Sequence, residues 1–238
     1  MVLSCVLIAP VLNCDEAYAQ RQWTGRVRGA FNALIQTDSA GLSQSFTLVK
    51  NREPAPIAAE LSSATVPLFD DGIFVRIVEN LGAGVAFSSL TRTDEAQITA
   101  RIPHPFFFNQ PRAINGVSSV EHKELATHLS AVYVVVSERF DVALLAGLSL
   151  FQVDKDFVED VAYDESYPYD TASFTRSGIN HESASKTGFH GGADVTWKLG
   201  RQWGIGGLLR YSKASVPFAD RSVDAGGLQA GGGLRVYF

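Results

Sequence analysis

The last thirteen residues constrain the fold of this chain more than any other stretch. In Gly226–Phe238, every second residue counted back from the terminal phenylalanine is apolar or glycine, and arginine, glutamine, tyrosine and glycine stand between them. A period of two with one apolar face is typical of a strand that meets an apolar environment on one side. The pattern runs to the final residue, so we expect the chain to end as a strand. No run approaches the roughly 18 apolar residues of a transmembrane helix, so strands would have to cross any membrane.

Seven earlier stretches repeat this alternation, most clearly between Phe189 and Leu199. There the apolar residues alternate with histidine, glycine, aspartate, threonine and lysine. With the closing strand, the predicted strands number eight. The segment 45–50, in the first long connection, is expected to extend a strand as a hairpin beyond the membrane. The predicted strands cover residues 22–36, 73–78, 81–88, 124–136, 140–150, 189–199, 203–212 and 226–238.

The connections between these strands alternate in length. Three tight breaks at 79–80, 137–139 and 200–202 alternate with long loops at 38–65, 94–118 and 156–185, and a short loop around Pro217 precedes the closing strand. Bacterial outer-membrane barrels have an even strand number, short periplasmic turns and longer extracellular loops. The sequence therefore predicts an all-β fold, an eight-stranded antiparallel up-and-down transmembrane β-barrel. Its three tryptophans would form an aromatic girdle near the short turns; they are Trp23, Trp197 and Trp203.

The first nineteen residues are predicted to be a secretory signal peptide. Val2–Leu12 is apolar, and Ala17-Tyr18-Ala19 offers a small-x-small cleavage site, although no basic residue precedes the apolar run. Residues 20–238 would then form a single barrel domain without cysteine, because Cys5 and Cys14 fall in the removed segment. A start further upstream, a buried N-terminal element and a lipoprotein site at Cys14 remain alternatives.

The closing GGGLRVYF, the eight-strand plan and the signal-like start resemble small outer-membrane β-barrels of the OmpA/OmpX type. The resemblance covers about residues 22–238 as a pattern, and loops such as RIPHPFFFNQPR and ESYPYDTASF look like those of uncharacterised barrel proteins. It implies a location in the bacterial outer membrane and recognition of Phe238 by the barrel-assembly machinery. A soluble lipocalin-like barrel is the alternative, but the strands offer few surface lysines and glutamates.

The positions opposite the apolar faces predict a polar lumen. The interior of an eight-stranded barrel is just wide enough for side chains to fill it. Buried charges need partners, so we expect Asp141 and Asp194 to meet lumen cations, with Asn32 and Gln229 beside them. The predicted structural network comprises Arg28, Arg76, His128, Asp141, His190, Asp194, Lys198, Arg210 and Arg235.

A non-enzymatic barrel with an envelope structural or surface-interaction role is the function that these features favour. A small-solute channel is one alternative, in which the excess of lumen cations would favour anions. A barrel enzyme acting on lipid or peptide at the outer rim is another, with His104, His122, His181 and Glu182 near the loops. No GxSxG, HExxH or phosphate-loop motif occurs. We therefore predict no catalytic residue, cofactor or metal ligand.

Two loops suggest external contacts. The loop 156–185 is acidic, which favours either plain solvation or a divalent cation that bridges to lipopolysaccharide. The loop 94–118 contains Phe106, Phe107 and Phe108, which could contact a partner, the outer leaflet or the barrel mouth. Outer-membrane lipid or lipopolysaccharide and an extracellular partner for these loops are the expected contacts. The net charge of −5 gives no support to nucleic-acid binding.

Overall fold

The computed structural model describes residues 25–37, 43–61, 65–219 and 221–238. The predicted signal peptide at 1–19 and Trp23 lie outside the described residues. All regular structure in the described part is antiparallel strand, and no helix there is long and apolar enough to cross a membrane. The strands are β1 (Val27–Thr37), β2 (Ser43–Lys50), β3 (Glu53–Leu61), β4 (Thr65–Val78), β5 (Leu81–Ile102), β6 (Arg112–Val136), β7 (Phe140–Glu165), β8 (Ala172–Lys198), β9 (Trp203–Phe218) and β10 (Arg221–Tyr237).

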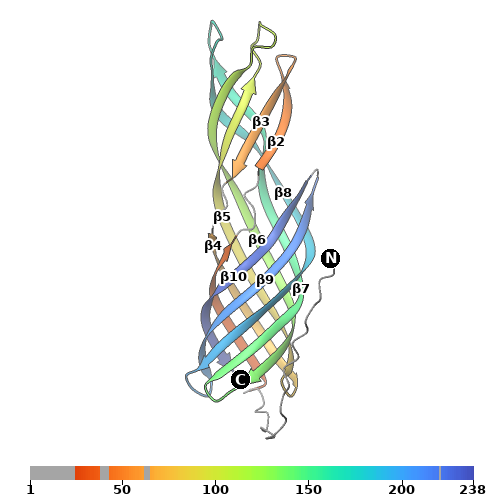
Figure 1. The fold of residues 1–238 in the computed structure, drawn as a ribbon, viewed down its shortest axis with the longest axis vertical. Helices are drawn as coiled ribbons and strands as arrows, with labels where there is room; N and C mark the ends of the chain where they lie inside the picture. Colours follow the sequence, from red (N-terminus) through yellow and green to blue (C-terminus); the bar gives the residue numbers. More distant parts are fainter. Residues whose placement is uncertain (1–24, 38–42, 62–64, 220) are drawn as a thin grey trace, which may run out of the picture.

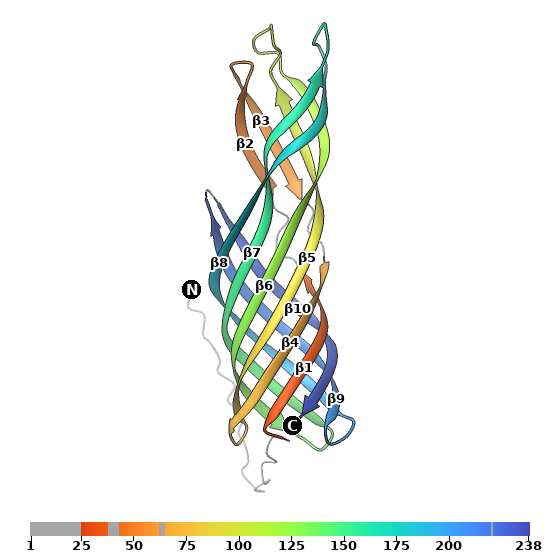
Figure 2. The same cartoon turned by 180° about the vertical axis from the view of Figure 1, so that it is seen from behind.

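Eight of these strands pair in a closed circuit. The ladder runs β5-β4-β1-β10-β9-β8-β7-β6, and β6 pairs again with β5. The closing strand β10 lies between β1 and β9, with Arg28 opposite Tyr237 and Val236 opposite Trp203. Figures 1 and 2 show the resulting cylinder from two sides, with the short turns gathered at its lower end. The predicted eight-stranded antiparallel barrel is confirmed.

The outer face of the lower barrel is apolar. Outward side chains such as Phe31, Leu148 and Leu234 are more than half exposed. A soluble barrel would bury such a face, so this surface contacts lipid. Trp197 and Trp203 flank the turn 200–202 and are also half exposed, as expected of an interfacial girdle.

The apolar surface, which we call the lipid belt, has a sharp upper limit. On β6, β7 and β8 it spans 125–135, 140–150 and 189–199, matching the roughly 9–11 residues of a transmembrane strand. Immediately above, the outward positions are Lys123 on β6, Gln152 on β7 and Thr187 on β8. A closed barrel with such a belt, short turns at one end and long hairpins at the other is built for the bacterial outer membrane.

The prediction of long loops is wrong over most of their length, because these residues form strands. β5 continues to Ile102 and β6 starts at Arg112, while β7 continues to Glu165 and β8 starts at Ala172. Alternation persists there with its polarity reversed, so that Ile98 is buried and Gln97 is exposed. Above the belt the outer face meets water and the inner face makes a core. An apolar-outward pattern therefore ends where the membrane ends, although the strand continues.

The segment 45–50 forms part of hairpin β2–β3, as expected, and this hairpin raises the strand number to ten. Both turn residues, Asn51 and Arg52, have positive φ (50° and 65°), as in a two-residue hairpin turn. β3 pairs with β5 only over 57–61, so Pro54 and Pro56 lie where β3 has β2 alone beside it. Proline is tolerated at such an edge because it lacks an N–H to donate.

One strand boundary and the orientation of one side chain also differ from what the sequence predicts. Pro217 belongs to β9, opposite Ser222, and not to a loop. In a regular strand Val78, two positions after Arg76, would share its inward face, but Val78 is 55% exposed. The register between β4 and β5 shifts between Arg76 and Val78, and such a bulge turns the following side chain to the other face.

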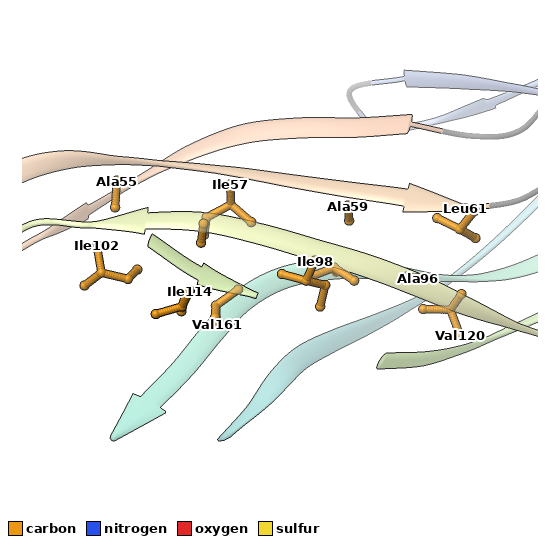
Figure 3. Packing of buried hydrophobic residues seen from close by; sticks show 12 residues of the cluster. Ala55, Ile57, Ala59, Leu61, Ala96, Ile98, Ile102, Ile114, Val120 and Val161 are labelled. Carbon is orange, nitrogen blue, oxygen red and sulfur yellow. The ribbon is translucent and has the colours of Figure 1, made fainter. Parts of the chain in front are cut away.

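We call the part above the belt the extracellular head. It consists of hairpin β2–β3 and the outer halves of β5–β6 and β7–β8, which rise together above the barrel (Figures 1 and 2). Its inner faces form an apolar core, drawn in Figure 3, to which all three hairpins contribute. The core residues are Ala55, Ile57, Ala59, Leu61, Ala96, Ile98, Ala100, Ile102, Ile114, Val120, Val158 and Val161.

Candidate functional site

The lumen at the short-turn end is occupied by an arginine pair on one carboxylate. Asp194 accepts hydrogen bonds from Arg28 and from Arg235, whose Nε and Nη2 lie 2.9 and 2.5 Å from Oδ2. Arg28 also donates to Thr196 over 2.9 Å. The side chains of the three charged residues are at most 5% exposed. Two guanidinium groups on one carboxylate leave a net positive, fully desolvated cluster across the lumen.

Asp141 forms a second ion pair next to this cluster. Its Oδ1 lies 2.7 Å from the ammonium of Lys198, and Tyr237 donates a long hydrogen bond of 3.5 Å to its Oδ2. Lys198 also donates to the carbonyl of Ser137 in the adjacent short turn. Arg76, another cation of the predicted set, is half-buried beside the bulge near turn 79–80.

Arg210 and Asp70 form a separate pair higher in the lumen. The guanidinium donates to Asp70 over 2.6 Å and to Gln229 over 2.7 Å. Asn32 donates to the other oxygen of Asp70, and Gln229 continues the chain of hydrogen bonds to Gln36. Sequence reasoning missed Asp70, because the predicted strand began at Ile73 while β4 begins at Thr65. The alternation Val66, Leu68, Asp70 was the available signal.

The two lumen histidines lie in one chain of hydroxyl and imidazole groups. The chain runs Ser88–His128–Ser149–His190–Ser130, with successive distances of 3.1, 2.7, 2.9 and 2.9 Å. Each ring nitrogen therefore has a partner, and both rings are at most 3% exposed. A catalytic serine–histidine pair needs a substrate that can reach it. Full burial of these rings and their serines fits a structural layer.

Apolar side chains fill the levels between and above these polar groups. Within the belt, Leu34, Leu68, Val132, Leu145 and Leu208 belong to one buried cluster. At the mouth, the inner faces of β9 and β10 pack against β7, and the rings of Phe157 and Phe218 meet edge to face at 5.3 Å. Further residues of this mouth cluster are Ala126, Phe151, Val153, Ala214, Val216, Val223 and Ala225. The lumen is thus filled in successive layers from the short turns to the head.

The tips of the three head hairpins are tied together, a feature that sequence reasoning did not identify. Arg112, 7% exposed, donates to the carbonyls of Pro103 and Tyr169 over 3.0 Å each and pairs with Glu165 at 2.6 Å. The β2–β3 turn joins through Asn51, which donates to the same Pro103 carbonyl over 2.8 Å. The tip of each hairpin is therefore fixed by its neighbours.

Further down the head, Lys50 on β2 pairs with Asp160 on β7 at 2.9 Å. Burial is the largest single influence on this carboxyl and raises its pKa. The hydrogen bond from Lys50, the N–H of Val161 and the Lys50 charge outweigh it, so the pKa of Asp160 lies below its ordinary value of 3.8. Gln44 adds a second contact from β2 to β7, accepting the N–H of Val158 over 3.3 Å.

The acidic stretch does not gather into a cation site. Among the described residues, no group of three or more histidine, cysteine, aspartate or glutamate side chains is placed to hold a metal ion. Its carboxylates are instead distributed over separate partners: Asp160 to Lys50, Glu165 to Arg112 and Asp156 to His181.

The candidate rim histidines occupy three different environments. His181 contacts Asp156 at 2.9 Å on the outer face of β7–β8, and its side chain is 58% exposed. His122 is buried 3.8 Å from Glu124, and His104 is buried beneath the phenylalanine tip. The His181–Asp156 pair lies on an open sheet face, and a surface ion pair alone does not indicate catalysis.

The chain is similar in fold to solved outer-membrane barrels. The Neisserial surface protein A (NspA) has 13% identity and a TM-score of 0.50 over 89% of this chain and 97% of that one. OprG from Pseudomonas aeruginosa has 11% identity and a TM-score of 0.47, covering 92% and 98%. Ail of Yersinia pestis has 12% and 0.40, covering 90% and 99%. No protein-family model and no curated protein matches the chain. The NspA match shows the fold alone, that of a small outer-membrane β-barrel.

Proposed function

We propose that this protein is a non-enzymatic, non-conducting outer-membrane barrel that holds a rigid head outside the cell for contact with an external partner. The observation that carries the proposal is the filled lumen beneath a tied head. Asp194, Arg28 and Arg235 occupy the lower end, and Phe157 and Phe218 close the mouth. Four of the eight barrel strands continue past the belt to build the head.

The test of the non-conducting role is a planar-bilayer recording of the refolded protein. We expect no stable conductance, because eight-stranded barrels leave just enough room for their own side chains. A large, stable and anion-selective conductance would establish the small-solute channel instead. An Asp194→Ala variant, which lacks the central carboxylate of the lower cluster, is the matched comparison. It shows how much conductance a disturbed lumen allows.

The enzyme alternative is tested at the exposed histidine. Purified protein is screened for phospholipase, deacylase and protease activity, and each activity found is measured again in His181→Ala and in His122→Ala. We expect no turnover above that of a refolding blank. Turnover that His181→Ala removes and His122→Ala preserves would assign catalysis to the His181–Asp156 pair and contradict the proposal.

The proposed partners follow from the same geometry. Outer-membrane lipid or lipopolysaccharide surrounds the belt, and the loops of the head meet an extracellular partner. Phe238 is proposed to be recognised by the barrel-assembly machinery. The residue is 74% exposed, while its carbonyl accepts the N–H groups of Arg26 and Val27. Removal of Phe238 is expected to lower outer-membrane yield in cells without lowering refolding in detergent. Equal yield in cells would remove this role.

A further inference from the structure

The end of the head that lies farthest from the short turns carries exposed aromatic rings. Phe106, Phe107, Phe108 and Tyr167 are 69%, 56%, 71% and 86% exposed. They lie at the β5–β6 and β7–β8 tips, at the top of the molecule in Figure 1. With Tyr169 we call them the aromatic apex. Large apolar side chains grouped in water mark an interaction surface.

The rings of the aromatic apex are held in place from below. His104 is buried, and its Nδ1 accepts the N–H groups of Phe106 and Phe107 over 3.1 and 3.2 Å. Phe106 meets Tyr169 at 5.4 Å and 67°, and Tyr169 meets Tyr167 at 6.2 Å and 86°. Neighbouring rings at such angles form the walls of a corner. Rigid aromatic side chains bind with little loss of conformational entropy.

The position of the aromatic apex separates it from the protein's own membrane. Between the belt and the tip, β5 and β6 stay paired from Thr91↔Lys123 to Ile102↔Arg112. At about 3.3 Å per residue, that ladder is roughly 35 Å long along the strand. The outer leaflet of the same cell is therefore out of reach. The apex residues do not pack over the barrel mouth, since four of the five are more than half exposed.

Exposed carboxylates lie beside the aromatic apex. Asp170 follows Tyr169 directly and is 75% exposed, and Asp164 is exposed on the same hairpin. Of the neighbouring cations, Arg112 is buried and already paired with Glu165, whereas Arg52 and Arg101 are exposed. Aromatic rings combined with a carboxylate favour a large, weakly hydrated cation such as a quaternary ammonium group. They disfavour an anionic surface.

We propose that the aromatic apex docks on the choline headgroups of an opposing phosphatidylcholine bilayer. The trimethylammonium group binds in the corner formed by Phe106, Tyr169 and Tyr167, with Asp170 as its counter-charge. Phe107 and Phe108 enter the boundary between headgroups and acyl chains. This inference rests on the proposed surface-interaction function and names its partner.

The test uses the full barrel in nanodiscs of phosphatidylethanolamine and phosphatidylglycerol, so that choline comes only from the probe. Labelled vesicles of pure phosphatidylcholine, of phosphatidylethanolamine, or of phosphatidylcholine with phosphatidylglycerol are floated with the nanodiscs. We expect binding to phosphatidylcholine to be about tenfold stronger than to phosphatidylethanolamine. Anionic lipid should weaken it, and soluble phosphocholine should compete.

Four variants assign the contact to named side chains. Phe107→Ala with Phe108→Ala should lower binding to all vesicles, whereas Tyr169→Ala and Asp170→Asn should remove the preference for choline. Val49→Ala is the matched control, because Val49 is 76% exposed on the β2–β3 hairpin outside the aromatic apex. Heat-modifiable migration of each variant shows that its barrel is folded.

The outcomes separate this inference from the proposed function. Equal binding to both zwitterionic lipids overturns choline recognition, and binding to no vesicle overturns bilayer docking, which leaves an extracellular protein as the partner. In both cases the non-conducting, non-enzymatic role stands, since the bilayer recording and the activity screen test it independently. Binding that Val49→Ala weakens as much as the phenylalanine pair would also contradict the assignment.

Discussion

The guanidinium of Arg112 lies 2.6 Å from the carboxylate of Glu165, and the pair joins the start of β6 to the end of β7 at the tip of the head. Arg112 also donates to the carbonyls of Pro103 and Tyr169. One buried side chain therefore connects both long hairpins. The head owes its single shape to this contact as well as to its apolar core.

Arg112→Ala should loosen the head without opening the barrel. The substitution leaves a partly buried Glu165 without its cation and the Tyr169 carbonyl without its donor, while the Pro103 carbonyl keeps only Asn51. We expect this to cost the head about 2–4 kcal/mol. Limited proteolysis and hydrogen exchange should show earlier cleavage and faster exchange at 103–111 and 166–171. Arg101→Ala, at an exposed position on β5, is the matched control. Unchanged protection in Arg112→Ala would mean that the apolar core alone orders the tips.

Asp194→Ala should destabilise the barrel more than any exposed charge change. Without this carboxylate, Arg28 and Arg235 face each other in a desolvated lumen, and breaking a buried pair in this way costs about 3–5 kcal/mol. The temperature at which folded migration is lost on a gel should fall accordingly. Asp224→Ala, which breaks the exposed Lys213 pair, should have little effect. Equal unfolding temperatures for both variants would refute the role assigned to Asp194.

Gly147→Ala should prevent normal pairing of β6 with β7. A Cβ on Gly147 would lie 1.8 Å from the carbonyl oxygen of Leu129, which is backbone and cannot move aside without breaking the ladder. Gly200→Ala is the control, because a Cβ there meets nothing within 4 Å. We expect refolding yield to collapse for Gly147→Ala alone. Equal yields would show that the β6–β7 wall tolerates a shift of that size.

The plan of the barrel could be predicted from the sequence, because a lipid-facing strand has a period of two and an apolar outer face. Phe189–Leu199 follows that rule along its whole length, and the closing strand follows it from Leu228 to Phe238. Gly226, expected on the outer face, is buried, and it and Gly227 have positive φ (87° and 149°). The head could not be predicted from the same rule. Above the membrane the polarity reverses, so Ile98 and Ile114 point inward and the strands resemble polar loops.

The sequence predicted which side chains line the lumen better than it predicted which of them pair. The sequence indicates that Arg210 points inward, but its pairing with Asp70 joins β9 to β4 across the barrel and depends on tilt and register. The same holds for His128 and His190, which share Ser149 although 62 positions separate the two rings. Arg112 was missed because it opens a strand in a segment predicted to be a loop.

Acid should weaken the attachment of hairpin β2–β3 to β7. The pKa of Asp160 is lower in the folded head than the ordinary 3.8, so its pair with Lys50 contributes stability above that pH. The contribution is lost as pH falls below 3.8 through the folded value. Cleavage of the β2–β3 hairpin by pepsin between pH 2 and 5, measured relative to an unfolded substrate at the same pH, should increase toward the acid end. Asp160→Asn should abolish this pH dependence, and a pH response that survives it would assign the effect to another group.

His104→Ala should disorder the phenylalanine tip while the rest of the head remains folded. The imidazole Nδ1 is the acceptor for the N–H groups of Phe106 and Phe107, and alanine leaves both without that partner beside a cavity. Hydrogen exchange of 105–109 should rise by about tenfold for each 1.4 kcal/mol lost, with β5 and β6 unchanged. His122→Ala controls for removing a buried imidazole elsewhere. Slow exchange at the tip of His104→Ala would show that the ring contact between Phe106 and Tyr169 suffices to hold it.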